Sequence, residues 1–219
     1  MSVDAPGGAL AVVTHAAIQL RRGRFEDALS HLRHAKALRD PSRTERLAGH
    51  AATITILQAH ARRCLAVEPD FDRHLQGEND AGAIDSSCDM AFVAYAKGEY
   101  AISVDVYGRV APDDHGWNVL GFFGHRFWAA CATGRLLREG AVSNASELRA
   151  NAYHWLEEEL RAVRIAADHH GPQAIEFLRT LIRIDDLEPF REFSRMPPDE
   201  ASSWRQLWSD AEDLVRRLD

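Results

Sequence analysis

Apolar residues recur with the period of an α-helix along nearly the whole chain, and this pattern constrains the fold most strongly. The C-terminal segment shows it best, because its apolar residues return every three or four positions and form one stripe. Pro198 suits the first turn of this helix, and Asp199 and Glu200 suit the positive end of its dipole. The stripe consists of Trp204, Leu207, Trp208, Ala211, Leu214, Val215 and Leu218.

The same signals predict an all-α fold of eight or nine helices. No segment alternates with period two between turns, so we expect no strand. The polar stretch 68–86 contains Pro, Gly, Asn and Asp, and we expect a long loop there. Besides the C-terminal helix, the expected helices cover 9–22, 25–39, 42–64, 87–96, 100–110, 119–137, 147–168 and 172–184.

Two of the expected helix corners share a short motif, in which glycine precedes an aromatic residue by two positions. Gly23 stands before Phe25, and Gly98 stands before Tyr100. Glycine tolerates a tight backbone at such corners. A small residue three positions after the aromatic one, Ala28 in the first motif, lets the paired helices approach closely. The motif therefore predicts helical hairpins of the kind that repeat about every 34 residues.

These residues resemble the second half of the tetratricopeptide repeat, G-x-[FY]-x-x-[AS]. The usual Trp-Leu-Gly of the first helix is missing, and the two glycines are 75 residues apart, so the repeat is irregular. The resemblance implies tetratricopeptide-like stacked helical hairpins, an irregular α-solenoid, over 1–140. It implies C-terminal helices over 141–219 on the same array, in one continuous domain. The implied packing residues are Gly23, Phe25, Ala28, Gly98, Tyr100, Tyr107, Trp204 and Trp208.

From about residue 43 onward, the chain also resembles the segment that follows the kinase domain in planctomycete-type bacterial Ser/Thr protein kinases. The stretches that carry this resemblance include YAKGEYAISVDVYGRVAPDD, GHRFWAACATG, YHWLEEEL and WRQLWSDAEDLVRRL, in the family's order. Phe127 and Trp128 stand where that family usually has Tyr-Asn. The chain has no Gly-rich phosphate loop, His-Arg-Asp or Asp-Phe-Gly motif, so the resemblance implies the accessory module without phosphotransfer. The chain is either a stand-alone relative or a piece of a longer protein.

Composition indicates a cytoplasmic protein that binds neither nucleic acid nor membrane. The net charge is −7, which is unfavourable for contact with phosphate backbones. No run of about 18 apolar residues occurs, and the N-terminus is a poor signal peptide. The three cysteines, Cys64, Cys88 and Cys131, are widely spaced and suit a reducing compartment.

No group of reactive residues predicts catalysis, a metal or a cofactor. His31 and His34 share a helix face, as do His154 and Glu158, but a metal site needs three or four converging ligands. Other candidates are the adjacent pair His169 and His170, the pair Cys131 and His125, and the turn acids Asp185 and Asp186. We expect the cysteine to be buried and inert and the turn acids to be solvated.

The sequence therefore predicts a non-catalytic module that binds a protein or peptide partner. Residues 1–66 carry 10 basic and 5 acidic groups, although the whole chain is acidic. Arg33, Lys36 and Arg39 lie three residues apart in succession, so they share a helix face that could attract an acidic segment. Two alternatives stay open: a helical enzyme or metal-binding protein that uses its histidines, and a structural domain that oligomerises through its last helix.

Overall fold

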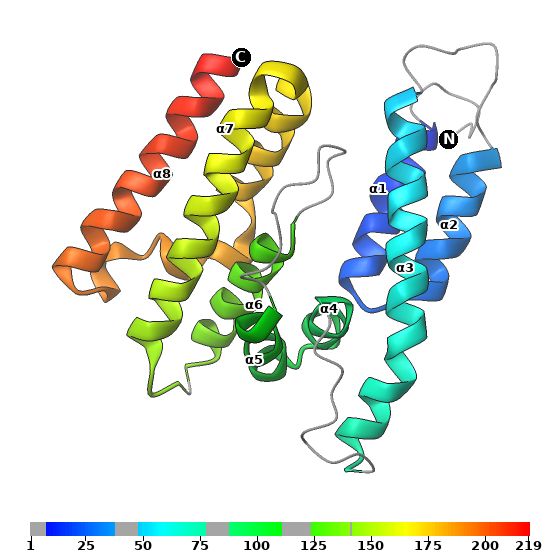
Figure 1. Cartoon of the computed structure of the whole chain (residues 1–219), viewed down its shortest axis with the longest axis horizontal. Coiled ribbons are helices and arrows are strands. Elements are labelled where there is room, and N and C mark those ends of the chain that lie inside the picture. Colours follow the sequence, from blue (N-terminus) through cyan, green and yellow to red (C-terminus); the bar gives the residue numbers. More distant parts are fainter. Residues whose placement is uncertain (1–7, 38–47, 78–87, 111–123, 141) are drawn as a thin grey trace. The chain divides into compact units, whose positions relative to one another are not determined.

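The computed structural model describes residues 8–37, 48–77, 88–110, 124–140 and 142–219. Within these ranges every regular element is helical and none is a strand, which confirms the all-α prediction (Figure 1). The chain divides into two compact units, residues 1–99 and 100–219, and the expected boundary near 140 lies inside the second unit. The first unit contains α1 (Gly8–Arg21), α2 (Phe25–Ala37), α3 (Ala48–Leu75) and α4 (Cys88–Lys97). The second contains α5 (Tyr100–Val110), α6 (His125–Glu139), α7 (Ala145–Arg183) and α8 (Pro198–Leu218), with short 3-10 helices η2 (Asp185–Phe190) and η3 (Phe193–Arg195).

Gly23 makes the corner between α1 and α2 for two physical reasons. Its backbone φ is +69°, a conformation that residues other than glycine rarely adopt. A Cβ at this position would also lie 3.3 Å from the backbone oxygen of Ala96 in α4. After the corner, Phe25 and Ala28 turn inward and are almost completely buried where α1 and α2 pack together.

We expect Ala28→Leu to destabilise the first unit by about 1–3 kcal/mol. Ala28 has no exposed surface, so the larger side chain has to push the packed helices apart. The matched control is Ala37→Leu, because Ala37 is exposed on the same helix and such changes usually stay within about 0.5 kcal/mol. Urea unfolding, followed by the circular dichroism signal of the helices, measures the free energy of unfolding of both variants. Equal stability of the two would show that the α1–α2 contact is not tightly packed.

Helix α3 is longer than the sequence predicted, because it continues through Pro69 to Leu75. The expectation of a loop from residue 68 was therefore wrong for 68–75; residues 78–87 lie outside the described part. Proline removes one backbone donor, but packing overrides its effect here. Phe71 is fully buried, and Lys97 Nζ lies 2.8 Å from Glu68 and 2.7 Å from Asp72.

Helix α6 is deeply buried in the second unit. All eight residues from Phe127 to Gly134 are buried, so this helix has no purely solvent-facing side over that length. Gly134 lies directly against η2, where an added Cβ would be 1.9 Å from the backbone oxygen of Asp186. The absence of a side chain at Gly134 therefore sets how closely α6 and η2 approach.

The two helices predicted over 147–168 and 172–184 form one helix, α7, with Pro172 inside it. The prediction of a break at Gly171 was wrong, although proline still disturbs the helix by removing a hydrogen bond. Figure 1 shows the ribbon of α7 bending sharply in its yellow section. No helix of the described chain has the length and apolar character that crossing a bilayer requires.

Helix α8 packs its apolar stripe into the second unit, as the periodicity predicted. Trp204 is stacked on Phe190 at 4.6 Å between ring centroids, and Tyr153 of α7 meets Trp204 edge-on. Trp208 Nε1 donates a hydrogen bond of 2.9 Å to the backbone oxygen of Phe190. Both tryptophans are thus core residues that tie α8 to η2, and neither is part of an exposed aromatic surface.

Candidate functional site

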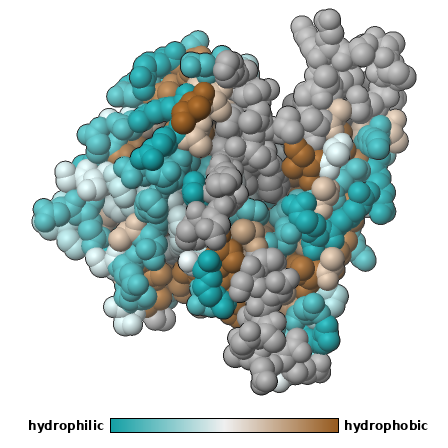
Figure 2. Space-filling view, viewed as in Figure 1, coloured by the Kyte–Doolittle hydropathy of each residue, from teal (hydrophilic) through white to brown (hydrophobic). Residues whose placement is uncertain are grey.

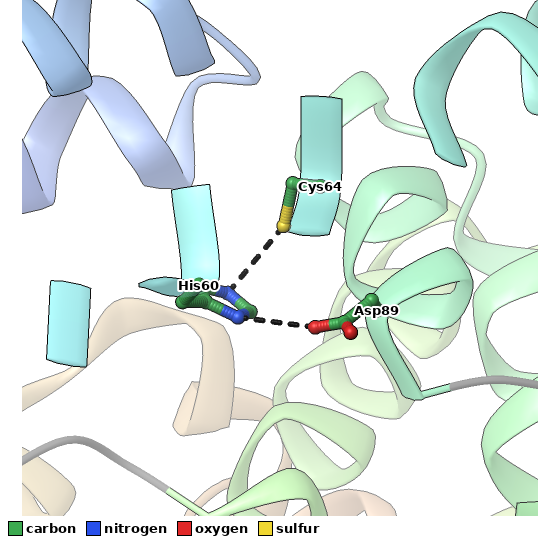
Figure 3. Close-up of side chains that lie close together, drawn as sticks. All are labelled: His60, Cys64 and Asp89. Carbon is green, nitrogen blue, oxygen red and sulfur yellow. Dashed lines mark hydrogen bonds and ion pairs between the residues drawn. The ribbon is translucent and has the colours of Figure 1, made fainter. Parts of the chain in front are cut away.

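Three side chains capable of acid–base or metal chemistry meet in the first unit, between α3 and α4 (Figure 3). His60 and Cys64 are four residues apart on α3, so they lie on the same face one turn apart. Asp89 comes from the first turn of α4, where the helix dipole favours a carboxylate. His60 and Cys64 are almost completely buried, and the Asp89 side chain is 18% exposed.

The imidazole of His60 lies between the other two side chains. Its Nε2 is 3.6 Å from Cys64 Sγ, and its Nδ1 is 3.2 Å from Asp89 Oδ1. The ring of Phe92 packs edge-on against the imidazole at 4.6 Å between centroids, which fixes the plane of the ring. The order thiol, imidazole, carboxylate is that of a nucleophile, its base and an orienting group.

Arg63 closes the cluster on its solvent side. Its Nε lies 2.8 Å from Asp89 Oδ2, and its guanidinium also approaches His60 Nδ1 at 3.5 Å. Burial alone would raise the pKa of Asp89, but the hydrogen bond from His60 and the positive charge of Arg63 outweigh it and lower that pKa. Asp89 is therefore a carboxylate at neutral pH.

Burial has the opposite outcome for the thiol of Cys64. Desolvation raises its pKa strongly, and the negative charge of Asp89 raises it further, against a smaller lowering by Arg63. The thiol thus stays protonated at neutral pH, whereas a cysteine nucleophile needs the thiolate. Cys64 is also 0% exposed, so a substrate has no access to its sulfur in this conformation. The arrangement is unsuited to nucleophilic catalysis.

The predicted packing residues are buried in most cases. Phe25, Ala28, Tyr107, Trp204 and Trp208 are in the core, and Tyr100 is half-buried at the start of α5. Gly98 ends α4 with a φ of +86°, but a Cβ there would meet no atom within 4 Å, so only its backbone conformation requires glycine. 

The predicted partner-binding residues lie on the outer side of α2. Arg33 and Lys36 are exposed, and Arg39 lies outside the described residues.

The reactive residues considered from the sequence have other surroundings. Cys131 is buried in α6, and His125 opens that helix six residues earlier, which is neither of the spacings, three or four residues, at which two side chains meet on a helix. His31 meets His15 of α1 edge-on at 4.5 Å between centroids. The side chains of His169 and His170 lie outside the described part.

The expectation that the turn acids are solvated was wrong for Asp186. Its side chain is 0% exposed and its Oδ1 lies 2.5 Å from Arg135 Nε. Asp186 is therefore half of a structural ion pair between η2 and α6. Its neighbour Asp185 is exposed, as expected for a turn acid.

The cluster of His60, Cys64 and Asp89 was missed from the sequence. The segment HARRC contains a signal, since histidine and cysteine at a spacing of four share a helix face. Asp89 is separated from Cys64 by the stretch 68–86, and nothing in the sequence indicates that α4 packs on this part of α3.

The fold and the cluster define the class: an all-helical protein with a buried Cys–His–Asp cluster in its first unit. Comparison with protein-family models finds no match, and neither does comparison with curated proteins or with solved structures. The function is therefore inferred from this chain's own residues.

Proposed function

We propose that the chain is a non-catalytic helical interaction module that binds an acidic protein or peptide segment at the outer face of α2. The observation that carries this proposal is that two cationic side chains of α2 are exposed and are not neutralised by acids of the described residues. Arg33 and Lys36 are exposed and three residues apart, and neither has an acidic partner among the described residues. By contrast, Arg63 and Lys97 of the same unit are held by carboxylates of neighbouring helices.

The rest of α2 supports this choice of face. Its buried residues, Phe25, Ala28, Leu29, Leu32 and Ala35, are used for packing against α1 and α3. The cationic side chains are on the remaining, outward side. A contact through that side leaves the core of the unit unchanged and would be guided by charge, so it would depend on salt.

The surface favours polar recognition over burial of a large apolar patch. On the face drawn in Figure 2, brown hydrophobic residues lie in small groups between teal hydrophilic ones. Among the described residues the exposed large hydrophobic side chains are Ile18, Leu75 and Ile165, on three different helices. Apolar patches that serve as interfaces are contiguous.

We further propose that α1, α2 and α3 stack in the manner of tetratricopeptide hairpins and that the partner belongs to bacterial Ser/Thr kinase signalling. Helix α1 packs on α2, and α2 packs on α3, in chain order. The glycine corner at Gly23 supports the first of these proposals. The second depends only on the sequence resemblance.

Reversing the charge of α2 should strongly reduce partner recovery. We expect the double variant Arg33→Glu, Lys36→Glu to capture the wild-type partner from native lysate at least several-fold less well at low salt, since like charges then face the acidic segment. Moderate salt should also reduce capture by the wild-type chain, because salt screens the attraction between the charges. Quantitative mass spectrometry of the eluates measures both effects.

The matched control is Arg22→Glu, Arg24→Glu, which makes the same charge change at two exposed arginines near the start of α2. It should recover the partner nearly as well as wild type. Equal recovery by wild type and the α2 variant at both salt concentrations would show that this face is not the binding site. Equal loss in both variants would assign the effect to net charge alone.

A further inference from the structure

We propose that His60, Cys64 and Asp89 bind a divalent transition-metal ion of the zinc type. One ligand atom of each residue lies within 4.8 Å of the others. Three different donor types thus lie close together on two helices that are already packed together. Metal binding at this cluster is independent of partner binding at α2, because none of the three residues is on that helix.

The spacing of the donors suits a tetrahedral ion. Zinc–ligand bonds of about 2.0–2.3 Å place neighbouring ligand atoms about 3.3–3.6 Å apart. The distance from Cys64 Sγ to His60 Nε2 is 3.6 Å, so an ion can bridge these two atoms without movement of α3. The carboxylate of Asp89 faces the other ring nitrogen, so it has to rotate toward the ion to become the third ligand.

One oxygen of Asp89 is prepared for such a role. Oδ2 is held by Arg63, whereas Oδ1 is buried and faces the His60 ring, whose Nδ1 is 3.2 Å away (Figure 3). A carboxylate that is fixed through one oxygen and points the other into a cluster is typical of metal sites with an outer layer of hydrogen bonds. Arg63 is 55% exposed, so its charge can move toward solvent when a cation enters.

The donor set selects the kind of ion. A thiolate and an imidazole favour zinc and its neighbours over magnesium and calcium, which prefer oxygen ligands. The thiolate and the carboxylate together balance a divalent charge. Binding forms the sulfur–metal bond and releases the thiol proton to solvent: Cys64–SH and M²⁺ give Cys64–S–M⁺ and H⁺. No oxidant or reductant is needed.

Cobalt(II) is the probe, because a cobalt–thiolate bond gives a near-ultraviolet charge-transfer band. Titration of the full chain with Co²⁺ should produce this band, saturating at one ion per chain, and Zn²⁺ should remove it. Asp89→Asn keeps the shape of the third ligand but removes its charge, so the apparent Kd for Co²⁺ should rise at least about tenfold. Absence of the band in the wild-type chain would overturn the proposal.

The decisive comparison is between two buried cysteines. Cys64→Ala should abolish the band, whereas Cys131→Ala, which makes the same change at a fully buried position of α6, should retain it. Circular dichroism establishes that each variant is folded. If Cys64→Ala does not fold, the Asp89→Asn titration decides, and an unchanged Kd there overturns the proposal. A band that survives in a folded Cys64→Ala chain, or that disappears only in Cys131→Ala, overturns it as well.

Discussion

Gly134→Ala should destabilise the second unit by at least about 3 kcal/mol, the upper end of the range for overpacked cores. The new Cβ would lie 1.9 Å from the backbone oxygen of Asp186 and 3.3 Å from the ring of Phe190. A backbone atom cannot turn aside as the end of a flexible side chain can, so η2 would have to move away from α6. That movement would also strain the ion pair between Arg135 and Asp186.

Urea unfolding followed by tryptophan fluorescence measures this loss, since all five tryptophans lie between residues 100 and 219. Gly108→Ala is the matched control. Gly108 is inside helix α5 and a Cβ there would meet no atom within 4 Å, so alanine should stabilise by about 0.5–1 kcal/mol through its higher helix propensity. The same substitution is thus expected to lower stability at Gly134 and to raise it at Gly108. A Gly134→Ala chain as stable as wild type would show that α6 and η2 are not in close contact.

Trp208→Ala should cost about 3–5 kcal/mol of the stability of the second unit. The change removes a large buried ring and the hydrogen bond from its Nε1 to the backbone oxygen of Phe190. It also removes the contact of the Arg191 guanidinium, whose Cζ lies 5.4 Å from the ring centroid. The expected result is a large fall in the urea midpoint, read from helix circular dichroism.

Trp208→Phe separates the hydrogen bond from the packing. Phenylalanine keeps an aromatic ring in the core but leaves the Phe190 oxygen without its donor, so the loss should be about 1–3 kcal/mol. An alanine variant that unfolds at the wild-type urea concentration would place Trp208 at the surface. It would then favour an aromatic recognition surface on α8.

Periodicity alone predicted most of the helices, because the sequence stripe and the buried face coincide in amphipathic elements. Helix α8 is the best example, since Trp204, Leu207 and Leu214 of the predicted stripe are all buried. The corner at Gly23 was also predictable, because a positive φ favours glycine and the glycine is visible in the sequence.

The errors arose where tertiary contacts override local signals. Pro69 and Pro172 are typical helix breakers, yet both lie inside helices that packing holds together. Asp186 looks like a solvated turn acid until the position of Arg135 is known. The cluster around His60 depends on how α4 packs on α3, and no local pattern in the sequence encodes that pairing.

The attachment of α8 has a consequence for any assembly of this protein. Three arginines of α7 pair with acids along α8 and just after it: Arg149 with Glu200 at 2.5 Å, Arg164 with Asp210 at 2.9 Å, and Arg179 with Asp219, the residue that follows α8, at 2.7 Å. The apolar stripe of α8 is buried by its own unit, so an assembly that uses this stripe requires α8 to exchange places with the α8 of a second copy. An exchanged helix would make the same three pairs.

The hydrogen bond from Trp208 to Phe190, however, ties α8 to the segment that would have to open as a hinge. Exchange between folded chains would therefore require α8 to detach, and loss of the Trp208 side chain would lower the barrier to that step.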